Sequence, residues 1–325
     1  MVCPAAISNL RCTAENTARN LIERIALVAS TEHQENTTPQ DDLSAGRRRL
    51  RTFRFPVLLV ALFAVMVAGA GINQLVSPVP MLALPVGIGL AFAAVTCYRR
   101  LCRVVELRPG IPELERTGRW SLLRRGALLG SGLFVALMVL IAVFGGWQGV
   151  SWGSFGGFLG TAGMMASVAV AEELVFRGVV FRIMEERTGT VIALVVSTLL
   201  FGATHLVNTN ATLWGALAIA LTGGTMTTAA YVVTRSLWLP IGLHFAWNFT
   251  HAGVFGVMLS GSDVPPHGLL NVTLSGPSAL TGGAFGPEAS LLALLVCLAP
   301  TIVLLRRAAR AGQIRHRPRR AGPSA

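Results

Sequence analysis

The sequence contains no lysine, so arginine supplies all 27 of its lysine-or-arginine positions. Charged residues make up only 13% of the 325 residues, whereas 53% are hydrophobic and the mean hydropathy is +0.61. This balance excludes an ordinary soluble domain and is typical of a polytopic membrane protein. The formal net charge of +12 could suggest nucleic-acid binding. The arginines cluster at the ends of apolar runs, however, where they act as topology signals, so we expect no nucleic-acid partner.

Cysteine is scarce, and the sequence has no Cys-x-x-Cys spacing and no cleavable signal peptide. The five cysteines are Cys3, Cys12, Cys97, Cys102 and Cys297. Their spacing indicates neither a disulfide framework nor a zinc knuckle. The first strongly apolar run begins only near Phe55, so we expect the first membrane helix to serve as its own uncleaved signal.

Apolar runs of roughly 17 to 25 residues recur along the chain, and each is long enough to cross about 30 Å of hydrocarbon. We predict about eight membrane helices, near residues 55–76, 79–98, 126–147, 155–184, 190–207, 212–234, 237–260 and 289–305. Arginines lie before the first of these runs and after the second, fourth, sixth and eighth, while the intervening loops contain none. By the positive-inside rule, this alternation predicts an all-α membrane bundle with both termini in the cytoplasm.

Two adjacent carboxylates and an arginine interrupt the apolar stretch 169–182, where every ionisable group is expensive to hold. Glu173 and Arg177 lie four residues apart with the acid N-terminal, which is the favourable order for an ion pair on a helix. Neighbouring helix positions point about 100° apart, so Glu172 needs a partner from another helix. A carboxylate in that position could act as a general base, and a purely structural role for both acids is the alternative.

Two later helices each carry a polar stripe with four-residue spacing. Phe201 and His205 share a face of one helix, and His244 and Asn248 share a face of the other. Counted at about 1.5 Å per residue from the cytoplasmic helix ends, Glu172 and Asn248 both lie roughly 18 Å deep. His205 lies about 22 Å deep and His244 about 12 Å deep on the same scale. Convergence near one level of the bilayer favours one common site over several separate packing residues.

In this order on successive hydrophobic helices, the polar residues resemble the three motifs of a family of intramembrane endopeptidases. It is the CAAX prenyl protease and bacteriocin-processing family, also called the Abi family, and the matching motifs are Glu172-Glu173-x-x-x-Arg177, Phe201-x-x-x-His205 and His244-x-x-x-Asn248. The resemblance covers roughly residues 156–260, and the Gly-rich stretch 281–288 also looks like bacterial members. It implies a multi-pass protein of the bacterial plasma membrane that hydrolyses a peptide bond of a membrane-associated protein or peptide.

The resemblance also implies a role for each motif residue. Glu172 would act as general base on a water that His205 helps to hold. His244 and Asn248 would stabilise the oxyanion formed when the peptide carbonyl is attacked. Glu173 would complete the catalytic set, with Arg177 and Phe201 as supporting residues. A base, a water-orienting imidazole and donors aimed at developing negative charge are chemically sufficient for hydrolysis.

A zinc ion is a second mechanism that the sequence leaves open. Glu172, His205 and His244 could supply three ligands of a catalytic zinc, with water as the fourth. The chain lacks His-Glu-x-x-His, the compact helical zinc signature, and the family has been described both as metalloproteases and as glutamate-dependent enzymes.

The motifs divide the chain into four parts: a cytosolic polar tail over 1–46, membrane helices with a basic cytosolic loop over 47–150, the catalytic membrane core over 151–260, and an outer loop, last helix and basic tail over 261–325. Two other functions compete with proteolysis. A proton-coupled transporter would use the same polar groups as a relay, and the pair Gly223-Gly224 is the one hint of a broken transporter helix. A non-catalytic bacteriocin-immunity or scaffold protein is the other alternative.

Overall fold

The structure of the protein is a computed structural model that describes residues 51–262 and 267–317. The chain divides into two compact units, Met1–Thr52 and Phe53–Ala325, and every feature below belongs to the second. The predicted polar tail over 1–46 lies outside the described residues.

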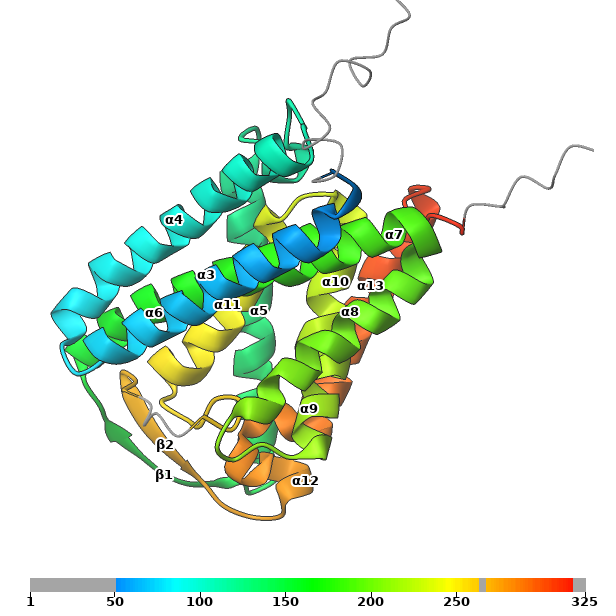
Figure 1. The fold of residues 1–325 in the computed structure, drawn as a ribbon. Coiled ribbons are helices and arrows are strands. Elements are labelled where there is room, and N and C mark those ends of the chain that lie inside the picture. The colour runs from blue at the N-terminus through cyan, green and yellow to red at the C-terminus, as the bar shows by residue number, and fades with distance from the viewer. Residues whose placement is uncertain (1–50, 263–266, 318–325) are drawn as a thin grey trace, which may run out of the picture. The chain divides into compact units, whose positions relative to one another are not determined.

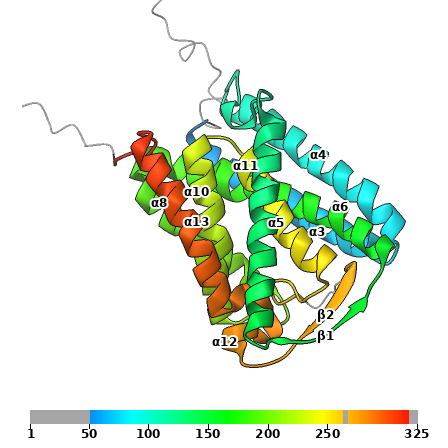
Figure 2. The ribbon, with the colours of Figure 1, turned by 180° about the vertical axis from the view of Figure 1, so that it is seen from behind.

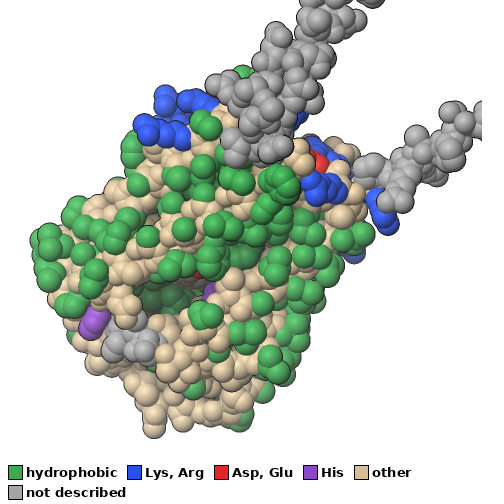
Figure 3. Space-filling model, in the orientation of Figure 1, with side chains coloured by type: hydrophobic (Ala, Val, Ile, Leu, Met, Phe, Trp, Pro, Cys, Tyr) green, Lys and Arg blue, Asp and Glu red, His purple; other side chains and the backbone are tan. Residues whose placement is uncertain are grey.

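Long apolar helices dominate the second unit (Figure 1). Among the described residues, six helical segments are long and apolar enough to cross a membrane. They are α3 (Arg54–Val76), α4 (Pro80–Val105), α5 (Arg119–Val143), α8 with its 3₁₀ extension η3 (Thr190–Val207), the run from α9 to α10 (Leu213–Thr234) and α13 (Leu291–Arg310). Their outward side chains, such as Val60, Phe92 and Leu295, are largely exposed and leave apolar surface that lipid solvates better than water. Basic side chains gather at one end of the face shown in Figure 3.

The other two predicted membrane helices are helical but do not count among the six. One runs without interruption through α6 (Phe155–Glu173), the π-helix η2 (Leu174–Phe181) and α7 (Arg182–Thr188). The other comprises α11 (Trp238–Asn248) and the π-helix η5 (Phe249–Val254). The count of eight membrane helices and the cytoplasmic position of both termini therefore stay predictions.

The helix predicted over 237–260 is too long, because the chain leaves the helix after Val254. Gly256 has a φ of +58°, and a Cβ on it would lie 2.1 Å from the carbonyl oxygen of Leu270. A residue with a side chain would be both strained and too close there. The chain turns at this glycine and runs against the strand β2 (Leu270–Leu274).

A short antiparallel sheet corrects the purely all-α prediction. The strand β1 (Trp147–Trp152) pairs with β2, with Val150 opposite Val272. Both strands lie at the end of the bundle opposite α7 (Figure 1). The helix predicted over 126–147 is shifted as well, because α5 ends at Val143 and Trp147 already belongs to β1. The short strand follows directly on an apolar helix, which is why its hydrophobic residues were read as the end of that helix.

Close backbone contact fixes α11 against α5. A Cβ on Gly126 would lie 2.3 Å from the carbonyl oxygen of Leu239, and one on Gly130 would lie 2.2 Å from that of Leu243. Small residues at this four-residue spacing let two helices approach closely in lipid. The view from behind shows α5 running beside α11, and α10 beside α13 (Figure 2). The result is a fixed position for α11, which carries His244 and Asn248.

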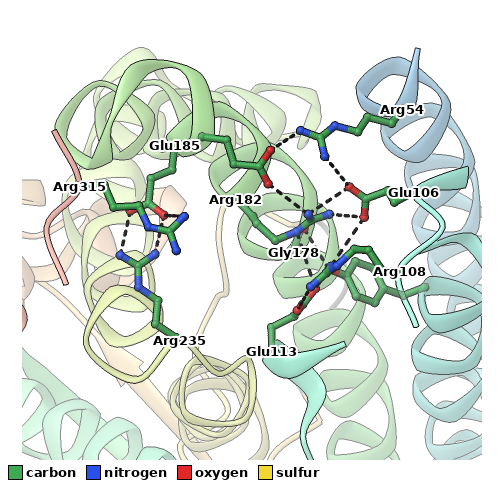
Figure 4. A network of polar contacts seen from close by, with 11 residues as sticks. Arg54, Glu106, Arg108, Glu113, Gly178, Arg182, Glu185, Arg235 and Arg315 are labelled. Atoms are coloured by element: carbon green, nitrogen blue, oxygen red, sulfur yellow. Dashed lines mark hydrogen bonds and ion pairs between the residues drawn. The ribbon is translucent and has the colours of Figure 1, made fainter. Parts of the chain in front are cut away.

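A polar network joins the loops at the basic end of the bundle (Figure 4). Arg182 lies between two buried acids: its guanidinium donates to Glu106 at 2.7 and 3.1 Å, and its Nε lies 3.7 Å from Glu113. Glu113 also accepts from Arg108 at 2.6 and 2.7 Å and from the Tyr98 hydroxyl at 2.6 Å. Paired, hydrogen-bonded carboxylates of this kind tolerate burial, so the network ties the loop after α4 to the start of α7.

Candidate active site

The ion pair predicted within α6 and η2 is confirmed. Arg177 Nη1 donates to Glu173 Oε1 at 3.0 Å, and both side chains are fully buried. The remaining donors of Arg177 reach the carbonyl oxygen of Gly224 at 2.9 Å and the hydroxyl of Thr228 at 3.3 Å. A buried guanidinium is stable only when its charge and its donors are both satisfied. Arg177 therefore fixes α6 and η2 against the run from α9 to α10.

Three π-helices adjoin the polar residues, and such wide turns are frequent at functional sites. η2 follows Glu173 directly, η5 follows Asn248, and η4 (Ala220–Gly224) provides the carbonyl that Arg177 contacts. The helix is continuous through η4. Gly223-Gly224 therefore does not break it, which removes the one hint of a transporter-like discontinuous helix.

His244 contacts both adjacent glutamates from α11. Its Nδ1 lies 2.8 Å from Glu173 Oε1, and its Nε2 lies 3.7 Å from Glu172 Oε2. Glu172 thus meets a side chain from another helix, as the helical geometry predicts. The two acids differ in exposure, because the side chain of Glu173 is fully buried while that of Glu172 is 18% exposed. Of the two, Glu172 is the one that an incoming molecule can reach.

Phe201 packs at the centre of the polar group. The guanidinium carbon of Arg177 lies 4.6 Å from the centroid of its ring, a cation–π contact. The rings of His205 and His244 meet the Phe201 ring edge to face, with centroids 5.1 and 5.8 Å away. Phe201 therefore packs against the Arg177 guanidinium and against both imidazole rings, and this packing helps to orient the two histidines.

A large cavity of about 560 Å³ opens beside Glu172. His205 and Asn248 border the same cavity, and α3, α4 and α6 supply most of its walls. Those walls are mainly apolar, with side chains such as Met66 and Met164. Figure 3 shows this face of the molecule hollowed, with apolar side chains in the hollow and histidine near its rim. A mainly apolar pocket with a few convergent polar groups is the usual form of a binding site.

A second, small cavity of about 30 Å³ adjoins the first, since His205 and Asn248 border both. His244 and Glu288 border only the small one. Glu288 is buried, and its Oε1 has no hydrogen-bond partner among the residues of the two described ranges. The cavity is large enough for about one ordered water with several polar neighbours. Sequence reasoning missed Glu288; the signal was an acid at the edge of the apolar run of α13.

Two polar groups at the cavity keep free hydrogen-bonding capacity. His205 Nδ1 lies 2.9 Å from the carbonyl oxygen of Phe201, which fixes the ring and leaves Nε2 available. The amide of Asn248 makes no hydrogen bond with any side chain or backbone group of the described chain. A carboxylate, an imidazole nitrogen and an amide thus face one space, which suits activation of a water and stabilisation of an oxyanion.

The donors expected for zinc do not form a metal site in this arrangement. Within the described ranges, no three His, Cys, Asp or Glu side chains lie close enough together to hold a metal ion. His244 uses Nδ1 for Glu173 and directs Nε2 toward Glu172, while His205 lies across the Phe201 ring. Glu172, His205 and His244 therefore do not fit one shared ion.

Comparison with known proteins gave one family match. Residues 154–250 match the family described as type II CAAX prenyl endopeptidase Rce1-like. No curated protein and no solved structure matched the chain. The matched span contains Glu172, Glu173, His205, His244 and Asn248, and this family indicates a protease that acts within a membrane. Residues 154–250 thus resemble the Rce1-like, type II CAAX prenyl endopeptidase family, in agreement with the resemblance of the motifs. The six long apolar helices indicate a multi-pass membrane protein.

Proposed function

We propose that the protein is an intramembrane endopeptidase that cuts a peptide bond of a membrane-associated protein or peptide in the plasma membrane of a bacterium. The observation that carries this proposal is the position of Glu172. Among the described residues its one ion-pair partner is His244 at 3.7 Å, and its carboxylate borders the large cavity together with His205 and Asn248. An acid held at a membrane-embedded cavity without a strong counter-ion points to chemistry.

In the proposed reaction, a water held between Glu172 and His205 attacks the carbonyl carbon of the substrate peptide bond. Glu172 takes one proton from that water, and the carbonyl electron pair moves onto oxygen. When the tetrahedral intermediate collapses, the carbon–nitrogen bond breaks and the leaving amine takes the proton from Glu172. This sequence yields a carboxylic acid and an amine and needs one residue as both base and acid.

The oxyanion would accept hydrogen bonds from the amide of Asn248 and from Nε2 of His244. Since Nδ1 of His244 faces Glu173, donation from Nε2 requires the imidazolium, which has two N–H donors. The charge balance supports this form, because two carboxylates are then offset by Arg177 and the imidazolium. Donors fixed in advance around developing charge lower the barrier more than donors that must reorient.

The apolar cavity suits a substrate that reaches the site from the lipid. Both a CAAX-type protein and a bacteriocin or other peptide precursor fit this description, and the family match favours the CAAX type. A cavity of about 560 Å³ holds a short peptide segment rather than a folded domain. We therefore propose an extended segment as the bound form.

The test is cleavage of a membrane-tethered peptide library by the purified protein in detergent. The Glu172→Gln variant should lose about a thousandfold in kcat, within the range that general base catalysis contributes. The matched control is Glu115→Gln, since Glu115 is an exposed acid in the loop before α5. Cleavage retained by Glu172→Gln would overturn the proposal. If neither the wild type nor Glu172→Gln cleaves, and thermal unfolding shows that both are folded, a binding role would be favoured first and transport second.

A further inference from the structure

One polar atom in the wall of the large cavity, Oδ1 of Asn73, has no hydrogen-bond partner among the described residues. Asn73 lies on α3, outside the matched span 154–250, and only 4% of its surface is exposed. Its Nδ2 donates to Ser167 Oγ at 2.7 Å. Its Oδ1 is buried and has no hydrogen-bond partner among the described residues. A buried carbonyl without a partner costs free energy, so this atom calls for an explanation.

The orientation of the Asn73 amide follows from the hydroxyl that it contacts. Ser167 Oγ donates its single proton to the carbonyl oxygen of Met164 at 2.8 Å. The hydroxyl can therefore only accept from Asn73, so the amide group of Asn73 must face Ser167 with its NH₂. Oδ1 consequently points away from Ser167. Asn73 also borders the large cavity that Glu172 borders.

The distance to Glu172 can be counted along α6. Ser167 precedes Glu172 by five residues of one helix, which is about 7.5 Å along its axis. An extended peptide rises about 3.3 Å per residue, so this separation corresponds to about two residues of bound substrate. The cavity wall between Asn73 and Glu172 is mainly apolar, so a hydrogen-bond acceptor in that wall is unusual.

We propose that Asn73 Oδ1 accepts a hydrogen bond from a backbone N–H of the substrate, about two residues from the bond that is cut. The proposal rests on the proposed protease function and deepens it. A peptide extended in an apolar cavity has N–H groups that neither water nor a helix satisfies, and Oδ1 is an acceptor in need of such a donor. Ser167 acts as a positioning residue, because it holds the amide in the orientation that presents Oδ1. A lipid chain offers no donor and would leave Oδ1 unpaired.

The test replaces single backbone N–H groups of a cleaved peptide with ester oxygens, leaving the scissile bond unchanged. For the wild-type protein, one ester about two residues from the cut should lower kcat/KM about tenfold, the value of one hydrogen bond. Asn73→Leu should show a similar, about tenfold loss in kcat/KM with the all-amide peptide. The same ester should then lower the kcat/KM of Asn73→Leu no further. Such non-additivity identifies two partners of one interaction.

Three further variants sharpen the result. Asn73→Asp keeps an acceptor, and the Ser167 hydroxyl can rotate to donate to the carboxylate, so this variant should keep the ester effect. Ser167→Ala removes the contact that orients the Asn73 amide, so this variant should show a smaller ester effect. Thr96→Val, a polar-to-apolar change on α4 away from the cavity lining, should match the wild type at every ester.

Two outcomes would overturn the proposal. One is an ester scan of the wild type in which no position within three residues of the cut affects kcat/KM, a result that does not depend on any variant folding. The other is an equal ester cost in wild type and Asn73→Leu. Either outcome counts only when the wild type cleaves and Glu172→Gln does not. Failure of the Asn73 proposal is therefore distinguishable from failure of the proposed protease function.

Discussion

Nδ1 of His244 lies 2.8 Å from Oε1 of Glu173, the same oxygen that accepts from Arg177 at 3.0 Å. A chain of three buried side chains therefore runs from a guanidinium through a carboxylate to an imidazole. Glu172, the adjacent acid, lies outside this chain and faces the cavity. The two neighbouring glutamates thus occupy different environments, and their substitution should have different effects.

Glu173→Gln should lower both stability and activity. Removing the carboxylate charge leaves Arg177 buried without its counter-ion, which costs about 3 kcal/mol, and frees the ring of His244. Glu172→Gln should lose activity at nearly unchanged stability, because no buried cation depends on Glu172 alone. Thermal unfolding in detergent, paired with cleavage rates, checks both variants. Equal unfolding temperatures for the two would contradict this division.

Arg177→Lys should destabilise the protein although the charge is kept. An ammonium cannot reach Glu173, Gly224 and Thr228 together as the planar guanidinium does. We expect a loss of about 2 kcal/mol from buried groups left without partners, measured by denaturant or thermal unfolding. Arg187→Lys, at an exposed position of α7, is the control and should unfold like wild type. A variant as stable as that control would show that the three contacts contribute little.

Acid should weaken the network at the basic end of the bundle through Glu113. Burial alone would raise the pKa of Glu113, but hydrogen bonds from Arg108 and Tyr98 and the charge of Arg182 together hold this pKa below its ordinary value. The folded protein thus binds this proton less readily than the unfolded chain. Stability from Glu113 is therefore complete above the unfolded pKa of about 4.3 and is lost as pH falls through the lower folded value.

Unfolding temperatures measured between about pH 6 and pH 3 test this sign. The wild type should lose stability as the solution is acidified, and Glu113→Gln should start lower and show a flatter acid limb. An acid limb of equal slope in the two proteins would assign the effect to other carboxylates.

Chelation should leave cleavage unchanged. No three metal-binding side chains gather in the described ranges, so the proposed reaction depends on Glu172, His205 and the donors of His244 and Asn248 alone. Prolonged incubation with a strong chelator, followed by the cleavage assay and metal analysis of the protein, checks this expectation. Activity that falls with chelation and returns with zinc would restore the three-ligand alternative.

Residue spacing along a helix predicted the contacts that form within a single helix. The Glu173–Arg177 pair follows from a four-residue separation, and the order of the motifs indicated the family. The contact between His244 and Glu173 could not be predicted this way, because it depends on how α11 is rotated against α6. Backbone contact at Gly126 and Gly130 fixes α11 against α5, but the spacing of these glycines in the sequence does not give the rotation of α11 against α6.

Single polar residues in apolar runs carried too little signal to be interpreted. Asn73 was part of an apolar stretch predicted as a membrane helix, and Glu288 stood at the end of a Gly-rich stretch. Each acquires meaning only from the cavity that it borders. The sheet of β1 and β2 was missed for a related reason, since two short strands far apart in sequence show no local pairing pattern.

The walls of the two cavities come from α3 at one extreme of the described chain and from Glu288, just before α13, at the other. During synthesis the ribosome delivers these segments in order, so the large cavity beside Glu172 has all its lining residues once His267 is made, and the small cavity has them only once Glu288 follows. A nascent chain that stops after the matched span 154–250 has every motif but lacks the wall that Glu288 supplies. The small cavity, which His205, His244 and Asn248 also border, therefore depends on a residue that is made after every motif of the matched span.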